Sequence, residues 1–182
     1  MTGQELKTNR LRLIPLTLDQ LRLCLTDRQQ LARELRLSLE QVDTTHPVDR
    51  AITIKISKMR QAPLEHHAWF TYWLIVIAGQ QSGAGFVGFK GIPDEQGEIE
   101  IGYGITPAYR NQGYTTEAVC ALIDWAFQAP DCRAIVALRT LKSNFPSHRV
   151  LEKVGMTVYE ETLETLSWRL TKEPLQLARE RG

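Results

Sequence analysis

A polar loop between an apolar strand pattern and a helical pattern constrains this chain more than any other stretch. The loop and the first helical turn read Tyr109-Arg110-Asn111-Gln112-Gly113-Tyr114-Thr115-Thr116-Glu117-Ala118. The apolar run 99–105 precedes it, and helical spacing continues after it to about Gln128. The order strand, turn, loop and helix directs several backbone N–H groups and the positive end of a helix at one point. The sequence therefore predicts an anion site suited to phosphate or pyrophosphate.

Three residue types in the loop fit that prediction. Gly113 lets the backbone approach a ligand closely and adopt a positive φ angle. Arg110 adds a fixed charge with the forked donor geometry that suits phosphate. Thr115 or Thr116 is expected to cap the following helix.

Three ordered segments of the chain resemble one protein family. Residues 110–115 resemble the R/Q-x-x-G-x-G/A loop of the GNAT superfamily of N-acetyltransferases, and residues 113–118 are similar to the G-Y-A-T-E-A of its ribosomal-protein N-terminal acetyltransferase branch. Residues 144–156 resemble that branch's N-x-x-S-x-x-V-L-E-K-x-G-F, and residues 8–16 resemble its T-x-R-L-x-L-R-P-L. Two departures are Thr115, where the family has Gly or Ala, and Met156, where it has Phe.

The resemblance implies the cofactor and its site. It implies a single acetyltransferase domain over residues 1–182 that uses acetyl-coenzyme A (acetyl-CoA) as co-substrate. The loop would hold the pyrophosphate, and the backbone of the preceding strand would pair with the pantetheine arm as an added strand does. The implied cofactor-binding residues are Tyr103, Gly104, Ile105, Thr106, Arg110, Asn111, Gln112, Gly113, Tyr114, Thr115 and Asn144.

Hydrophobic periodicity divides the rest of the chain. Alternation predicts strands at 11–14, 69–78, 86–90, 98–105, 134–138 and 166–170, and helical spacing predicts helices at 18–25, from Gly113 to about 128 and from Asn144 to Gly155. Thr17 and Gln20 form a capping-box pattern. The segment after Pro47 fits a helix, although the alternation at 52–56 also fits a strand. The region 27–45 is polar with spaced leucines, and no helix or strand boundaries can be assigned within it.

The predicted element order favours an α/β fold. An antiparallel meander precedes a parallel pair around Gly113, which gives a mixed, mostly antiparallel twisted sheet with helices on both faces. That the parallel pair splays apart to admit the cofactor is implied by the resemblance alone. The segment Gly83-Ala84-Gly85-Phe86-Val87-Gly88 spells a dinucleotide fingerprint, but a strand pattern follows it where that motif needs a helix. A hairpin is therefore predicted there.

Composition argues against nucleic-acid-binding, membrane-spanning and disulfide-rich secreted proteins. The formal net charge is +1 with both signs mixed, so nothing indicates nucleic-acid binding. No apolar run is long enough to span a bilayer, and the polar N-terminus does not resemble a signal peptide. Cys24, Cys120 and Cys132 lack disulfide or metal spacing, which favours reduced thiols and a cytoplasmic location. Monomer and homodimer both stay open.

Glu100 is the candidate general base. In the strand 98–105, Glu98, Glu100, Gly102 and Gly104 share one face, and two glycines beside a carboxylate leave room for a substrate. Glu100 stands where the branch has the Glu of E-I/L-G-Y, to which the role of base is assigned. For Glu98 we expect a solvated surface role.

Ser147 is the candidate acid or thiol-orienting group. It matches the Ser of the branch motif, although a first-turn serine that only bonds backbone is the alternative. The tyrosine acid of many family members is absent, because Leu151 stands in its position. His148 is expected at the surface, and Cys120 in the core rather than as a nucleophile. His66-His67 lacks metal-ligand spacing, so no metal is expected.

These observations predict direct transfer of an acetyl group from acetyl-CoA to a primary amine. The acceptor is either a protein N-terminus or a small-molecule amine. The alternatives are an acyl-CoA-binding module without catalysis and an interaction protein that kept the fold.

Overall fold

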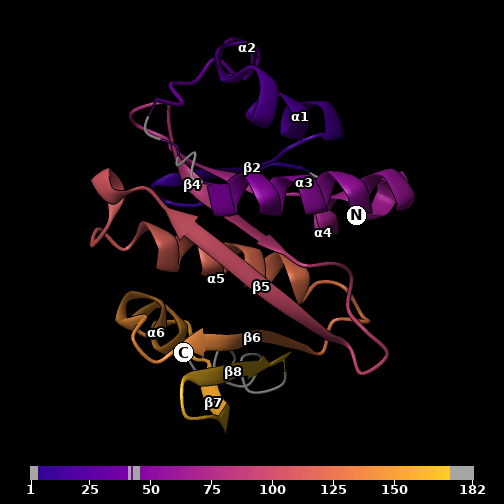
Figure 1. Cartoon of the computed structure of the whole chain (residues 1–182), viewed down its shortest axis with the longest axis vertical. Helices are drawn as coiled ribbons and strands as arrows, with labels where there is room; N and C mark the ends of the chain where they lie inside the picture. The colour runs from indigo at the N-terminus through magenta and orange to yellow at the C-terminus, as the bar shows by residue number, and fades with distance from the viewer. Residues whose placement is uncertain (1–3, 41, 43–45, 173–182) are drawn as a thin grey trace.

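One mixed sheet organises the structure. The computed structural model describes residues 4–40, 42 and 46–172. The sheet has eight strands in the order β1-β2-β3-β4-β5-β6-β8-β7 (Figure 1). Their bounds are β1 Leu6–Lys7, β2 Leu11–Pro15, β3 Trp73–Ile77, β4 Ser82–Phe89, β5 Glu98–Ile105, β6 Ala134–Leu141, β7 Thr157–Glu161 and β8 Thr165–Thr171. All neighbours pair antiparallel except β5 and β6, which are parallel.

Helices cover both faces of the sheet. Their bounds are α1 Leu18–Thr26, α2 Arg28–Leu35, α3 His46–Gln61, α4 His67–Phe70, α5 Tyr114–Ala126 and α6 Phe145–Lys153, with short 3-10 helices η1 Leu64–His66 and η2 Pro107–Tyr109. On β3, Leu74 and Val76 belong to a core that includes α1–α3, whereas Ile75 and Ile77 belong to a core that includes α5 and α6. Alternate side chains of one strand thus anchor two layers. The fold class predicted from the sequence is confirmed.

The parallel strands β5 and β6 pair over a short distance only. Their partners are Glu98 with Ala134, Ile99 with Ile135 and Glu100 with Val136. Beyond Glu100, β5 keeps its partner β4 as far as Ile105 but has no partner on β6. Figure 1 shows the two strands moving apart toward their C-terminal ends. We call this separation the β5–β6 opening, and it confirms the splayed pair.

Several predicted boundaries need correction. The strand expected at 69–78 begins only at Trp73, because Trp69 and Phe70 lie in α4. Trp69 packs against Phe89 and Trp125, and such burial is compatible with either a helix or a strand. The ambiguous segment after Pro47 is helical in α3, and the undivided region contains α2. The strands β1 and β7 were not predicted.

The glycine-rich segment at 83–88 lies inside β4, as the hairpin prediction requires. A Cβ on Gly85 would lie 2.1 Å from the carbonyl oxygen of Gly104, and one on Gly83 would lie 2.7 Å from a methyl group of Leu39. Close packing within the protein explains these two glycines. The dinucleotide interpretation is excluded because a strand occupies the place of the required helix.

Candidate active site

The polar loop joins the free end of β5 to α5. Gly113 is the N-cap residue of α5 with φ 79°, and Asn111 also has a positive φ of 60°. Successive positive and negative φ values turn neighbouring N–H groups into one concavity, which is a common anion site. The predicted positive φ of Gly113 is confirmed.

The predicted threonine cap is wrong. Gly113 occupies the N-cap position and has no side chain to bond the helix, while Thr115 and Thr116 lie within the first turn of α5. No cap side chain therefore competes for the first N–H groups of α5. A ligand anion can accept hydrogen bonds there instead.

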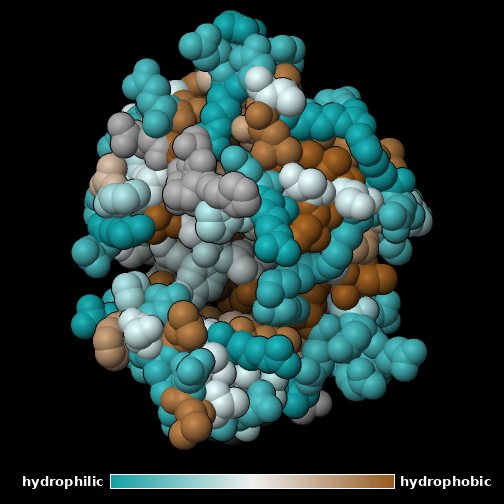
Figure 2. Space-filling view, viewed as in Figure 1, coloured by the Kyte–Doolittle hydropathy of each residue, from teal (hydrophilic) through white to brown (hydrophobic). Residues whose placement is uncertain are grey.

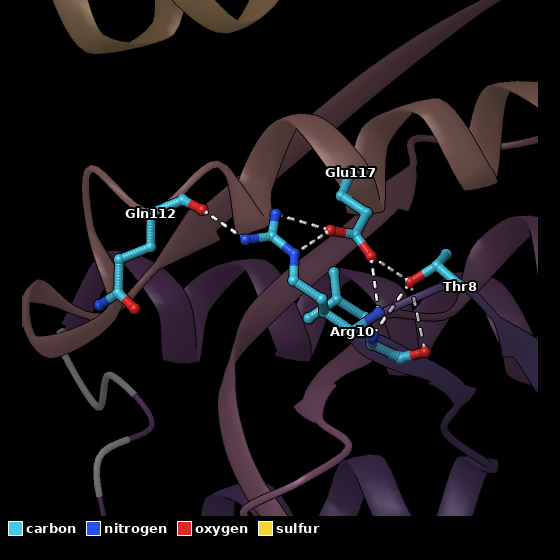
Figure 3. Close-up of polar contacts among 5 residues, drawn as sticks. Thr8, Arg10, Gln112 and Glu117 are labelled. Carbon is cyan, nitrogen blue, oxygen red and sulfur yellow. Dashed lines mark hydrogen bonds and ion pairs between the residues drawn. The ribbon is translucent and has the colours of Figure 1, made fainter.

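Arg10, in the turn between β1 and β2, forms hydrogen bonds with the loop and with the first turn of α5 (Figure 3). Its Nη1 donates to the carbonyl oxygen of Gln112 at 2.9 Å, and its Nε donates to a carboxylate oxygen of Glu117 at 2.7 Å. Thr8 donates its hydroxyl hydrogen to the same carboxylate at 2.6 Å, and the backbone N–H of Arg10 donates at 3.0 Å. The guanidinium also lies 4.7 Å from the centre of the Tyr114 ring. The motif at 8–16 and the loop thus form one structural unit.

Glu117 is held as a carboxylate by this network. Although partial burial opposes ionisation, the hydrogen bonds from Thr8 and Arg10 and the charge of Arg10 leave the pKa of Glu117 lowered. Neither Arg10 nor Glu117 was a predicted site residue. Their separation in sequence hides the contact, and the only signal was that each lies in a family-like motif.

Arg110 and Tyr109 differ in how they are held. The Tyr109 hydroxyl donates to Ser82 at 3.0 Å, which ties the end of η2 to the start of β4. The side chain of Arg110 is exposed, and no described residue forms a hydrogen bond or ion pair with it. Its guanidinium is therefore available to a ligand.

Tyr103 connects β5 to α6 across the β5–β6 opening. Its hydroxyl donates to the backbone carbonyl of Ser147 at 3.3 Å, and burial raises the pKa of Tyr103 to about 12. Its neighbours Gly104 and Ile105 pair with β4 along one edge and have no β6 partner along the other. Thr106 is only 1% exposed and its hydroxyl has no partner among the described residues. Its backbone N–H donates to the carbonyl oxygen of Ala84 at 2.8 Å, and its carbonyl accepts from the N–H of Tyr109 at 3.1 Å, so both of its backbone polar groups already have partners.

The other face of β5 is open beside Glu100. A Cβ on Gly102 or on Gly104 would meet no atom within 4 Å. The Glu100 carboxylate accepts a hydrogen bond from the Lys90 ammonium at 2.5 Å, and the equivalent pair at Glu98 is with Arg169, also at 2.5 Å. In the view of Figure 1, Figure 2 shows a hollow between the part that carries α1–α3 and the part that carries β6, with hydrophobic residues inside it. The positions of Gly102 and Gly104 therefore leave free space on the face of β5 that carries Glu100.

The start of α6 matches its prediction. The Asn144 side chain accepts from the backbone N–H of Ser147 at 3.3 Å, and Ser147 is half-buried. Leu151 is 1% exposed in the core. Among the described residues, no hydrogen bond or ion pair joins Glu100 to Ser147, and Tyr103 is the residue that links β5 to the Ser147 backbone.

The surface position predicted for His148 is wrong. His148 is 8% exposed, its Nε2 lies 3.0 Å from the carbonyl oxygen of Leu141, and its ring lies 5.6 Å from that of Trp168. The strand β8 covers this side of α6. The sequence of α6 does not indicate which of its polar residues will be covered by β8, because β8 lies later in the chain.

Lys55 of α3 is a buried cation that sequence reasoning missed. Its ammonium donates to the carbonyl oxygens of Phe70, Thr71 and Phe89 at 3.2, 3.1 and 2.7 Å, and lies 4.3 Å from the centre of the Tyr72 ring. Burial, with smaller effects from Lys58 and Lys90, lowers the pKa of Lys55 to about 7. A lysine within the apolar stripe of a helix was the available signal. Lys55 therefore joins the backbone at the end of α4 to the end of β4, the strand that pairs with β5.

Other features lie outside this site. A hollow of about 470 Å³ between β1 and α5 borders Thr8, Glu117 and Cys120, on the opposite face of the sheet from Glu100. Within residues 4–40, 42 and 46–172, no cluster of three or more His, Cys, Asp or Glu residues is arranged to hold a metal ion. Across the same residues, no helix has the length and apolar character needed to cross a membrane.

A protein-family comparison identifies the chain by sequence. The family model described as "Acetyltransferase (GNAT) domain" matches residues 10–157. Two relatives from Bacillus subtilis (strain 168) are the uncharacterized N-acetyltransferases YjdG, 36% identical over 99 residues, and YnaD, 39% identical over 57 residues. These matches cover 54% and 31% of this chain, and 58% and 33% of the relatives' own lengths.

Solved structures share the fold at low sequence identity. A GNAT-family acetyltransferase from Bacillus anthracis superposes with a TM-score of 0.62 at 19% identity, covering 93% of this chain and 99% of the other. RimL, a ribosomal alpha-N-protein acetyltransferase in complex with coenzyme A, gives 0.64 at 18%, covering 92% and 98%. The self-immunity acetyltransferase MccE, in complex with acetyl-CoA and AMP, gives 0.60 at 16%, covering 90% and 93%.

Proposed function

Because the chain belongs to the GNAT acetyltransferase family, we propose that it transfers an acetyl group from acetyl-CoA to a primary amine. The observation that carries the proposal is the position of the anion loop. The loop begins where β5 has lost its β6 partner, so one end of the sheet offers both a free strand edge and an anion concavity. A ligand with a peptide-like arm and a pyrophosphate needs these two features side by side.

The loop residues fit the phosphates of that ligand. The backbone of Asn111, Gln112 and Gly113 would supply N–H donors with the first turn of α5 at Tyr114 and Thr115, and the exposed Arg110 would add charge. The free edge of β5 at Tyr103, Gly104 and Ile105 would pair with the amides of the pantetheine arm. Asn144, at the start of α6, would border the thiol end.

Acetyl-CoA supplies the thioester carbonyl that the amine attacks directly. On the open face of β5, Glu100 would attract the cationic acceptor and take its proton, directly or through water. Lys90 is 62% exposed at its side chain, so the incoming ammonium can replace it at the carboxylate. Ser147 would orient or protonate the leaving sulfur. The position at which many family members have a tyrosine acid is occupied by Leu151, which lies in the core, so this helix offers no phenol for that role.

The acceptor is proposed as a protein N-terminus or a small-molecule amine. Two relatives of the same fold support acetyl transfer as the reaction, since their names describe a ribosomal alpha-N-protein acetyltransferase and a microcin self-immunity acetyltransferase. The open space over Gly102 and Gly104 is compatible with either kind of amine.

Two measurements test this function. Calorimetry with coenzyme A tests the binding site, and a panel of amino acids, short peptides, polyamines and aminoglycosides with acetyl-CoA tests transfer through the release of free thiol. Binding with thiol release for at least one amine supports the proposal. Binding without release for every amine would indicate a non-catalytic acyl-CoA-binding module, and failure to bind would indicate an interaction protein with this fold.

A further inference from the structure

We propose that Arg10 is a positioning residue that presents the Gly113 N–H to the ligand anion, acting from outside the loop. The inference rests on the proposed cofactor function and adds to it a residue from a distant part of the chain. It is carried by the contacts of Arg10 with Gln112 and Glu117 (Figure 3).

The first step concerns one peptide unit. The carbonyl of Gln112 and the N–H of Gly113 belong to the same planar trans peptide, so they point in opposite directions. Arg10 donates to that carbonyl at 2.9 Å and so holds it on the side of the β1–β2 turn. The Gly113 N–H must then point away from Arg10, and we infer that the concavity expected from the positive φ values of Asn111 and Gly113 opens on that side.

The second step concerns the freedom of Gly113. A glycine can rotate its peptide at small energetic cost, so Gly113 alone does not fix the direction of this N–H. Four contacts fix Arg10 itself: its Nε and its Nη2 on Glu117, each at 2.7 Å, its backbone N–H on Glu117 at 3.0 Å, and its packing against Tyr114. A donor anchored this firmly can hold the Gln112–Gly113 peptide in one orientation.

The third step concerns charge. Glu117 lies in the first turn of α5, where a carboxylate stabilises the helix but repels a ligand phosphate. Arg10 offsets that charge and leaves the concavity attractive to anions. Orientation and charge compensation therefore come from one side chain.

The test compares Arg10→Met, Arg10→Lys and a matched control, Arg12→Met. Arg12, on β2, forms a similar ion pair at 2.7 Å with Glu5, which directly precedes β1, and the described contacts of the Arg12 side chain are with Glu5 and Gln81 and not with the loop. Thermal melting first establishes that each variant is folded. Hydrogen–deuterium exchange of residues 107–117 in the ligand-free protein then measures how well the loop is ordered. Calorimetry measures the affinity for coenzyme A and for pantetheine.

We expect faster exchange in the loop of Arg10→Met than in Arg12→Met, and coenzyme A affinity lower by about ten- to a hundred-fold, the range for hydrogen bonds of charged groups. Pantetheine, which lacks the pyrophosphate, should bind both variants as it binds the wild type. Arg10→Lys keeps the charge but lacks the fork that reaches both Gln112 and Glu117, so most of the loss should persist.

Three results would overturn the inference: wild-type loop exchange in Arg10→Met, an equal loss for pantetheine, or full recovery in Arg10→Lys. The exchange measurement needs no cofactor. If the wild type fails to bind coenzyme A, the proposed function fails, whereas unchanged exchange refutes the role of Arg10 independently.

Discussion

The Lys90 ammonium lies 2.5 Å from a carboxylate oxygen of Glu100, and the two side chains differ in exposure, at 62% for Lys90 and 19% for Glu100. The carboxylate is therefore fixed by the strand while its partner is free to move into solvent. Glu98, two residues earlier on the same face, has a comparable pair with Arg169. The two glutamates provide a natural comparison between a proposed base and a surface ion pair.

Glu100→Gln should lower kcat/KM by about 10²–10⁴ with coenzyme A affinity little changed. An alkyl amine has a pKa of about 10.4, so about one molecule in a thousand is neutral at pH 7 and a proton acceptor is needed. The remaining activity should rise with pH, because solvent must then deprotonate the amine. Steady-state kinetics from pH 6 to about 9 measure both effects, and Glu98→Gln is the matched control.

Wild-type kcat/KM and pH dependence in Glu100→Gln would show that another group accepts the proton. A fall near the lower end of the range would favour an α-amine acceptor, whose pKa of about 8 makes the need for a base smaller.

Gly113→Asp should abolish coenzyme A binding, because a non-glycine residue would be strained at φ 79° and its Cβ would lie 3.4 Å from Nη2 of Arg10. A carboxylate there would add negative charge to the loop and compete with Glu117 for Arg10. Arg110→Ala should weaken binding by about 1.5–3 kcal/mol, the range for hydrogen bonds of charged groups. Calorimetry measures both. Gly79→Asp is the control, since a side chain there meets no atom within 4 Å. Unchanged affinity in Gly113→Asp would refute the loop assignment.

Ser147→Ala should lower kcat by tens-fold or less and leave the fold intact. A thiolate whose acid has a pKa of about 8.5 is already a fair leaving group, so help from an acid is modest. The Tyr103 hydroxyl donates to the Ser147 backbone carbonyl, and that hydrogen bond survives the substitution. Presteady-state and steady-state rates test this, and a loss beyond about a thousand-fold would indicate a structural role.

Lys55→Met should change how stability depends on pH. The pKa of Lys55 is about 7 in the folded protein against 10.5 for a free lysine, so between these values the unfolded state binds more protons. Wild-type stability relative to Lys55→Met should then rise with pH, by up to about 1.4 kcal/mol per pH unit. Urea unfolding of both proteins at pH 6.5, 7.5 and 8.5 measures the difference.

A pH-independent difference would show that Lys55 keeps its proton across this range. The three carbonyl oxygens that it contacts would then outweigh the cost of burial, because only the ammonium form has three N–H donors for them.

The features that depend only on neighbouring residues were correctly predicted from the amino-acid sequence. Thr17 and Gln20 form the predicted capping box, Asn144 caps α6, and Gly113 has the positive φ expected of it. The alternation of β5 correctly separated its buried isoleucines from the Glu100 face. Such features are decided by local hydrogen bonds, backbone sterics and periodicity, which a short segment carries within itself.

The contacts between residues far apart in the sequence became known only from the folded structure. Arg10 donates to Glu117, which lies 107 positions later in the sequence. Lys55 donates to the carbonyl oxygen of Phe89, 34 positions later, and His148 packs against Trp168. The place of Trp69 in α4 was settled in the same way, by packing against Trp125. A polar or aromatic residue has the same local pattern whether or not a distant strand covers it, so its partner is fixed only when the sheet brings the two segments together.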